Sequence, residues 1–283
     1  RAERKLRFFC FKQRARLLDL KLSSELQSWK KLNVYDVFQS LVSRIVFKNN
    51  YKIHESGTAD GIHDSGFCTN LMLCLLCDNS TVIFYVDPKS DKEYFHCDHC
   101  DLRFLNPKFR LEAEAEKARY QAHTIDVLDV GHQRFVMPMV ETVLKKITPR
   151  QKGLDFGSGP DSVLSYLLTS RGFQIEQYDP YFNPKTECIN KIYDYILATE
   201  VIEHFYNPAQ EFIKLNQMLQ AKGALGIMTL FFHDQIDFSS WHYRNDATHV
   251  CFYSKKSIQW IADTYQFEKV EFIDSRTIWM VKP

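Results

Sequence analysis

Two carboxylates and a glycine turn occur together near the middle of the chain, in Gly153-Leu-Asp-Phe-Gly-Ser-Gly-Pro160 and Tyr178-Asp179-Pro180. Asp155 ends one expected strand, and Asp179 ends a second expected strand 24 residues later. Glycines let the backbone approach a ligand closely, and the helix after such a turn presents free N–H groups to an anion. This spacing predicts a nucleotide-like ligand across a parallel sheet. Ser162 stands where a dinucleotide fingerprint has glycine, which argues against NAD.

A third segment, Tyr195-Ile-Leu-Ala-Thr-Glu-Val-Ile-Glu-His204, is a further expected strand that ends on polar groups. Strands are expected at 153–156, 174–178, 195–199 and 224–230, and helices at 162–171, 208–219 and 255–265. Asn207 caps the second of these helices and Gly223 closes it, while Ser254 caps the third. Two last strands, 267–273 and 277–281, are joined so tightly that they must be antiparallel. The pattern predicts an α/β doubly wound, Rossmann-like sheet with a C-terminal antiparallel hairpin.

Cysteine spacing indicates a metal site ahead of this sheet. Four of the eight cysteines form two C-x2-C pairs with 19 residues between them: Cys74, Cys77, Cys97 and Cys100. Such pairs supply four thiolates to one tetrahedral zinc ion, and β-forming residues at 81–86 and 92–95 predict a hairpin between them. We expect a small zinc ribbon whose closed site holds structure and performs no chemistry, with His96 and His99 as exposed neighbours. Two disulfides are the alternative, but no secretory signal supports the oxidising compartment that they need.

Composition limits the classes of function. The chain has 283 residues, of which 45% are hydrophobic, enough for one large domain and a smaller unit. Residues 1–71 carry 13 basic and 7 acidic side chains, whereas the rest carries 23 and 28. The main body therefore lacks the basic footprint of a nucleic-acid binder. The longest apolar runs, Leu71–Cys77 and Ala224–Phe232, are far shorter than the roughly 20 residues of a membrane span. We expect a soluble, cytoplasmic protein.

The chain divides into four expected regions: 1–71, an N-terminal extension of unknown role; 72–107, the ribbon; 108–148, a helical connector or lid; and 149–283, the sheet domain. Met72 lies near the expected start of the functional unit, and 34–47 can form a short amphipathic helix. In the connector, Leu111–Tyr120 has strong helix formers. It is either a solvated helix or a lid that brings Tyr120 and His123 over the ligand.

Several of these segments together resemble a known family. The glycine turn, the Asp179 segment, the segment ending at His204 and the run Trp241-His-Tyr-Arg-Asn-Asp-Ala-Thr-His249-Val-Cys-Phe-Tyr-Ser254 resemble class I S-adenosylmethionine-dependent methyltransferases. Within that class they look most like the branch near the ubiquinone-biosynthesis O-methyltransferases. The cysteine pairs followed by Glu116-Lys-Ala-Arg-Tyr120 resemble bacterial members with an N-terminal zinc ribbon. The resemblance covers residues 72–283.

The resemblance implies a set of cofactor-binding residues: Asp155, Gly157, Ser158 and Gly159 around the methionine part, Asp179 and Pro180 at the ribose, and Thr199 and Glu200 beside the sulfonium. Two features depart from the family. Asp161 stands where a third glycine is common, so it either weakens binding or caps the following helix. Residues 183–194 are too few for a strand and helix with an adenine-reading acid, which leaves Cys188, Ile189 and Asn190 as the available contacts.

Methyl transfer from a sulfonium depends mainly on alignment, and a base assists when the acceptor is a hydroxyl or a protonated amine. His204 and His249 are the expected catalytic bases, against the alternatives of local packing and a structural hydrogen bond. Trp241, Tyr243 and Phe252 form either an aromatic acceptor wall or core packing. We expect methyl transfer to a small-molecule oxygen or nitrogen. The alternatives are an RNA methyltransferase, or an inactive module that still binds the cofactor.

Overall fold

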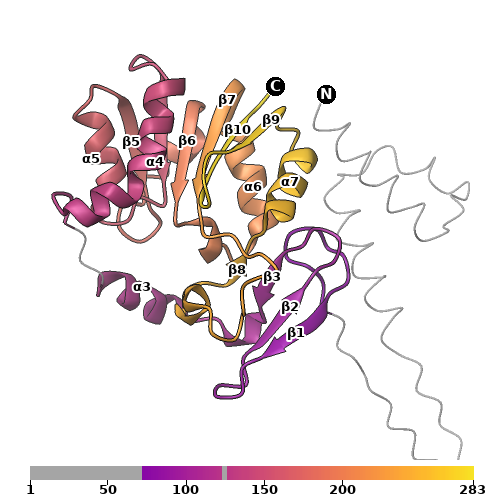
Figure 1. Cartoon of the computed structure of the whole chain (residues 1–283). Helices are drawn as coiled ribbons and strands as arrows, with labels where there is room; N and C mark the ends of the chain where they lie inside the picture. Colours follow the sequence, from indigo (N-terminus) through magenta and orange to yellow (C-terminus); the bar gives the residue numbers. More distant parts are fainter. Residues whose placement is uncertain (1–71, 123–125) are drawn as a thin grey trace, which may run out of the picture. The chain divides into compact units, whose positions relative to one another are not determined.

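The computed structural model describes residues 72–122 and 126–283, and a six-stranded sheet lies at its centre in the order β5-β4-β6-β7-β10-β9 (Figure 1). The parallel strands are β4 (Lys152–Phe156), β5 (Gln174–Tyr178), β6 (Tyr193–Thr199) and β7 (Leu219–Met228). The strands β9 (Lys269–Phe272) and β10 (Thr277–Val281) pair antiparallel, and β10 also pairs antiparallel with β7. The sheet confirms the expected α/β architecture with a closing hairpin.

Helices cover both faces of this sheet (Figure 1). They are α4 (Val130–Lys146) and α5 (Val163–Thr169) on one face, and α6 (Pro208–Gln217) and α7 (Lys255–Thr264) on the other. Alternate residues of β6 point to the two faces: Tyr195 and Leu197 pack with α4 and α5, whereas Ile196 and Ala198 pack with α6 and α7. Because both faces of β6 are buried, its sequence is an almost unbroken apolar run.

Serine side chains begin two of these helices. The Ser162 hydroxyl accepts a hydrogen bond from the Ser165 amide at 3.0 Å at the start of α5. Ser162 is therefore the cap, and the alternative role of Asp161 as that cap is wrong. At the start of α7, Ser254 and Ser257 form a reciprocal capping box, as the sequence predicts for Ser254.

The strand after α6 begins earlier than predicted. The helix ends at Gln217 and β7 begins at Leu219, so Gly223 lies inside the strand and does not close the helix. β7 carries an irregularity opposite β6 here, with Lys222 at a φ of +60°. A Cβ atom at Gly223 would lie 2.9 Å from the Gln220 carbonyl oxygen. The glycine therefore serves a close backbone approach within the strand rather than a helix end.

A second sheet lies beside the first in the order β1-β2-β3-β8. Its strands are β1 (Val82–Val86), β2 (Glu93–His96), β3 (Arg103–Leu105) and β8 (Cys251–Phe252), all antiparallel to their neighbours. The β1-β2 hairpin confirms the prediction, whereas β3 and β8 were not expected because strands this short carry no periodic signal. Leu102, Phe104 and Leu105 share one hydrophobic cluster with residues of α6 and α7, so this small sheet packs directly on the main domain.

The remaining elements are short connections: η2 (Pro107–Phe109), α3 (Ala113–Gln121), η3 (Cys188–Asn190), η4 (Ile202–His204) and η5 (His242–Asn245). Between β5 and β6, where every residue is described, η3 is the single helical turn, as the short spacing predicts. None of the helices in the described part is long and apolar enough to cross a membrane. The helix expected at 34–47 and the side chains of Cys10, Cys68 and His123 lie outside the described residues.

Candidate functional site

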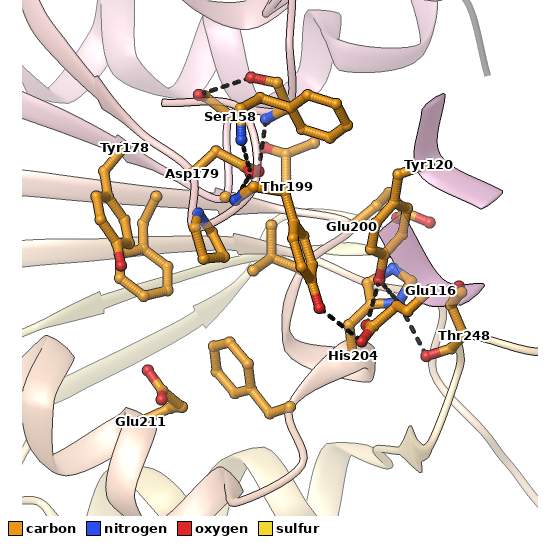
Figure 2. A pocket seen from close by; sticks show the side chains of 18 of the residues that line it. Glu116, Tyr120, Ser158, Tyr178, Asp179, Thr199, Glu200, His204, Glu211 and Thr248 are labelled. Carbon is orange, nitrogen blue, oxygen red and sulfur yellow. Dashed lines mark hydrogen bonds between the residues drawn. The ribbon is translucent and has the colours of Figure 1, made fainter. Parts of the chain in front are cut away.

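A cavity of about 840 Å³ lies at the carboxyl ends of β4, β5 and β6, with residues of α3 and α6 in its walls (Figure 2). Its volume falls in the range of roughly 300–1,000 Å³ typical of small-molecule sites. The cavity is lined by nine of the ten predicted cofactor-binding and catalytic residues: Gly157, Ser158, Gly159, Asp179, Pro180, Thr199, Glu200, His204 and His249. The sequence therefore located nine of the 27 lining residues, from four separate segments.

Asp155 is the exception, because it does not line the cavity. Its side chain is 3% exposed, and one oxygen accepts hydrogen bonds from the Ser162 and Ser165 hydroxyls at 2.5 and 2.7 Å. Burial raises the pKa of this carboxyl group. Asp155 ties the end of β4 to the first turn of α5 and so supports the glycine turn from behind. Asp161 is exposed and is likewise not part of the lining.

The glycine turn combines a crowded position at Gly157 with open space at Gly159. Gly157 and Gly159 have φ angles of +76° and +66°, the left-handed region that favours glycine. A Cβ atom at Gly157 would lie 2.6 Å from a Val201 methyl group, whereas one at Gly159 would meet nothing within 4 Å. The amides of Gly157 and Ser158 donate to the Tyr178 carbonyl at 2.8 and 3.1 Å, which fixes the turn against the end of β5.

The Asp179 carboxylate is held by main-chain amides. Its Oδ2 accepts from the Gly159 amide at 3.0 Å, and its Oδ1 accepts from the Tyr181 and Phe182 amides at 2.8 and 3.0 Å. Each carboxylate oxygen offers two lone pairs, so Oδ1 is fully used and Oδ2 keeps one acceptor position for a ligand hydroxyl. Because rigid backbone groups hold the side chain, it is oriented before any ligand arrives.

Thr199 and Glu200 follow at the tip of β6. The Thr199 hydroxyl oxygen is buried and has no hydrogen-bond partner in the described part of the chain. A buried polar atom of this kind indicates a missing partner, and the cavity is where that partner would lie. Burial, together with the neighbouring Glu203, raises the pKa of Glu200 to about 8, although Arg276 lies 3.4 Å away. Glu200 has a φ of +52°, a left-handed backbone conformation that is costly for a residue other than glycine.

Two histidines meet at one end of the cavity, with ring centroids 4.8 Å apart. The Nδ1 atoms of His204 and His249 lie 3.0 and 2.7 Å from the carbonyl oxygens of Thr248 and Tyr243. A carbonyl only accepts, so we assign the proton to Nδ1 in both rings, and both Nε2 atoms keep a free lone pair. Burial lowers the pKa of both imidazoles, that of His249 to about 4, so both are neutral near pH 7.

Glu203 supports this end of the cavity from the core. It is completely buried, accepts a short hydrogen bond from the Tyr243 hydroxyl, and accepts from the Thr229 hydroxyl at 3.1 Å. Burial raises its pKa to about 7. Ligand atoms of Glu203, His204 and His249 lie within 4.8 Å of one another, so these three groups could also hold a divalent cation. Trp241, Tyr243 and Phe252 are buried core residues that do not line this cavity. Of their two possible roles, core packing is therefore right and an acceptor wall is not.

The sequence analysis assigned no role to Glu116, which α3 places in the cavity wall. Its two carboxylate oxygens accept from the Tyr120 and Tyr181 hydroxyls, both at 2.9 Å (Figure 2). Burial beside Glu116 raises the pKa of both hydroxyls, so they stay protonated donors. Arg119 adds two hydrogen bonds to Asp246, at 2.9 and 3.1 Å. Ala113, Glu116 and Tyr120 share one helical face, a signal that could have identified them, and the lid interpretation of α3 fits their position.

The opposite wall comes from α6 and the loop before it, which the sequence analysis also did not assign to the site. Phe205, Glu211 and Lys214 line the cavity there. Cys188, Ile189 and Asn190, the residues expected to be available for adenine, do not line it, because η3 folds against the edge of β5. The connection between β5 and β6 is therefore short as expected, but its residues do not reach the cavity.

The four paired cysteines come together in the small sheet. Their sulfur atoms all lie within 4.8 Å of one another, with Cys74 and Cys100 at 3.5 Å and Cys77 and Cys97 at 3.4 Å. Zn–S bonds of about 2.3 Å in a tetrahedron place sulfur atoms ~3.8 Å apart, so this donor set fits zinc. His99 is exposed as expected, whereas His96 is part-buried and lies 2.8 Å from an Asp101 oxygen. Neither histidine joins the thiol cluster.

Comparison with known proteins identifies one matching family. A family model described as a methyltransferase domain matches residues 120–271, more than half of the chain. No curated protein matches the sequence.

Solved structures of similar fold include three methyltransferases. An O-methyltransferase family protein from Burkholderia thailandensis has 14% identity and a TM-score of 0.41, over 62% of this chain and 61% of that one. Phosphoethanolamine N-methyltransferase 2 from Haemonchus contortus, in complex with S-adenosyl-L-methionine, has 13% identity and a TM-score of 0.45, over 64% and 62%. Magnesium protoporphyrin IX methyltransferase from Synechocystis PCC 6803 has 14% identity and a TM-score of 0.40, over 61% and 92%. The chain spans less than two thirds of the first two proteins.

Proposed function

The chain belongs to the methyltransferase-domain family, and from this premise we propose that it transfers the methyl group of S-adenosylmethionine to an oxygen or nitrogen atom of a small molecule. One observation carries the proposal: a single cavity holds the Asp179 carboxylate and, at its far end, two neutral histidines with free Nε2 atoms. The ubiquinone-biosynthesis O-methyltransferase branch is the branch that we propose, on the segment from Thr199 to His204.

The residues present fit this methyl donor. The open space beside Gly159 suits the amino-acid part of the donor, and Asp179 Oδ2 keeps one acceptor position for a ribose hydroxyl. The unpartnered Thr199 hydroxyl would gain a hydrogen-bond partner in the bound molecule. When bound, S-adenosylmethionine supplies a methyl group that its sulfonium has already activated.

His204 and His249 are the groups that we propose for proton transfer. The carbonyls of Thr248 and Tyr243 hold each Nδ1 proton, so the Nε2 lone pairs can receive the proton that an acceptor hydroxyl or ammonium must lose. Their lowered pKa keeps them unprotonated at neutral pH. Alignment of the acceptor against the donor methyl supplies the larger part of the rate.

The charge of the cavity favours a small acceptor over a nucleic acid. Arg119 and Lys214 are the only Lys or Arg side chains among the described lining residues, and they pair with Asp246 and Glu211. No basic group is left over there for a phosphate backbone, which RNA binding requires. The proposed acceptor is therefore a neutral or cationic small molecule. A cytoplasmic location of the protein stays a prediction.

We further propose that the four cysteines bind one structural zinc ion and that residues 72–107 are a zinc ribbon. Four thiolates complete a tetrahedral site and leave no position for a reacting water. We also propose that residues 108–148, which follow the ribbon, form a connector and that residues 149–283 form the catalytic domain. The zinc would hold the two cysteine turns in register beneath the short strands β2 and β3.

Native mass spectrometry of the full chain with zinc and S-adenosylmethionine tests both assignments. We expect one zinc ion and one S-adenosylmethionine per chain. Asp179→Ala should lose S-adenosylmethionine binding, whereas Asp161→Ala should keep it. A folded protein that binds neither would overturn both proposals. Transfer of labelled methyl groups to fractionated cell extract then identifies the acceptor, and label in RNA instead of small molecules would overturn the small-molecule assignment.

A further inference from the structure

We propose that α6 supplies the adenine subsite of the cofactor, with Glu211 and Lys214 reading the edge of the base. This proposal rests on S-adenosylmethionine as the methyl donor. It starts from the topology, because β5 is an edge strand and the chain passes from β5 to β6 with only η3 between them. Within residues 72–122 and 126–283, no strand lies beyond β5 to bring an acidic side chain to the base from that side.

The direction of the bound nucleoside follows from the two ends of the cavity. Figure 2 shows Asp179 and Thr199 in the middle, with Tyr120, His204 and Thr248 at one end and Tyr178 and Glu211 at the other. Methyl transfer requires the sulfonium to face the histidine end. The base is attached to the opposite side of the ribose from the sulfonium. With the ribose on Asp179, the base must enter the end formed by Tyr178 and Glu211.

That end has aromatic walls. Phe156, Tyr178 and Phe205 line the cavity, and Phe156 lies 5.4 Å from Tyr178 and 6.3 Å from Phe205 between ring centroids. All three side chains are nearly buried, so an entering base meets apolar ring surface rather than water. Aromatic surfaces of this kind stack on a base at about 1–3 kcal/mol per base in other proteins. The histidine end is lined instead by the His204 and His249 imidazoles and by the Tyr120 side chain.

The polar groups at this end match adenine. Glu211 and Lys214 lie one helical turn apart on α6, with a Glu211 oxygen 3.8 Å from the Lys214 nitrogen and each side chain about one-third exposed. They present an acceptor beside a donor. Adenine presents the complement, an amino donor at C6 beside a ring-nitrogen acceptor. The Lys214 nitrogen lies 5.2 Å from the Phe156 ring centroid, so the pair sits directly at the aromatic wall.

A change of one exocyclic group tests this assignment. Hypoxanthine replaces the C6 amino donor by an oxygen acceptor, which would face the Glu211 carboxylate. We expect the full chain to bind S-adenosylhomocysteine about 10- to 100-fold more tightly than S-inosylhomocysteine in isothermal titration calorimetry, because a lost hydrogen bond leaves two acceptors facing each other. In Glu211→Gln the amide can donate to the oxygen, so the preference falls below about threefold.

Two further variants complete the experiment. Lys214→Met keeps the apolar stem and removes the donor, and we expect it to weaken S-adenosylhomocysteine binding about 3- to 10-fold. Glu141→Gln changes an exposed glutamate of α4 that does not line the cavity, and it should bind both ligands like the wild type. If Glu211→Gln keeps the wild-type preference, the base lies elsewhere and the inference is overturned while the proposed function stands. If the wild type binds no S-adenosylhomocysteine, both fail together.

Discussion

The ribbon and the cavity both gather polar side chains into one place, but they are assembled in opposite ways. The four cysteines come from two tight turns within residues 74–100. The cavity joins groups that are far apart in the chain, such as Arg119 with Asp246 and Tyr120 with His204. The four cysteines need only two short turns to meet, although β8 and a shared hydrophobic cluster tie their sheet to the main domain. The cavity, in contrast, exists only when the whole sheet and α3 have folded. The proposed zinc site would be closed and structural, whereas the cavity is open to ligands.

The two regions are nevertheless joined by one segment. Residues 241–252 contact both the small sheet and the cavity. Arg244 contacts the Asp87 carboxylate of the β1-β2 turn at 3.2 Å, and β8 pairs with β3. The same segment carries Asp246, Thr248 and His249 into the cavity wall. The ribbon therefore holds part of the site in place without contributing a lining residue of its own.

The largest expected effect comes from removing a zinc ligand. Cys97→Ser should abolish zinc binding and lower the free energy of unfolding by ~4 kcal/mol or more, because metal binding and folding of such sites are coupled. Zinc content by mass spectrometry and thermal unfolding measure both. Cys188→Ser changes a buried cysteine outside the cluster and should keep one zinc ion per chain. Stoichiometric zinc in Cys97→Ser would show that Cys97 is not a zinc ligand and that the four cysteines do not form one site.

Removing a proposed base should affect turnover and not cofactor binding. The side-chain amide of His204→Asn can still donate to the Thr248 carbonyl in place of Nδ1, but Nε2 is gone. We expect kcat to fall by about 10²- to 10³-fold, within the usual range for a general base. The dissociation constant of S-adenosylhomocysteine should change less than about threefold. A fall of less than tenfold in kcat, repeated in His249→Asn, would mean that neither histidine takes the proton.

Cutting the link between the two regions should have a smaller effect. Arg244→Met removes the ion pair with Asp87 while keeping an unbranched apolar side chain against Tyr85 and Phe238. We expect about a 10-fold lower kcat with zinc content and the KM for S-adenosylmethionine unchanged, because His249 and its neighbours lose part of their support. Asp87→Asn should give a weaker version of the same result. An unchanged kcat would show that the segment is held without the ribbon.

The smallest expected effect is a pH dependence of stability. Burial raises the pKa of Glu203 to about 7 from an unfolded value near 4.5. Between these values the folded protein holds a proton that the unfolded chain has lost, so this group lowers stability as pH rises, by at most about 1.4 kcal/mol per pH unit. Glu203→Gln should remove that slope in urea unfolding measured at pH 5 to 8. An identical slope in wild type and variant would mean that Glu203 is ionised throughout.

The sequence predicted the sheet and the strand-end part of the cavity because the relevant signals are local. A strand that ends on Asp179 or Thr199 and a glycine turn after β4 each lie within a few residues, and carboxyl ends of parallel strands meet at one edge. Short strands such as β8 escaped prediction because two residues carry no period. Asp155 was placed in the site because the pattern shows that a carboxylate ends the strand, but not which way its side chain points.

Sequence alone thus determined the zinc-type cysteine spacing, the order of the main-sheet strands along the chain, and several of the segments that line the cavity. Tertiary structure alone decided that Glu116 and Tyr120 from α3 close one wall, and that Glu211 and Lys214 from α6 form the other. It also decided that Asp155 supports the glycine turn rather than the ligand. The physical reason is that cysteine turns and strand ends encode their geometry locally, whereas the direction of a side chain across a cavity depends on the packing of elements far apart in the chain.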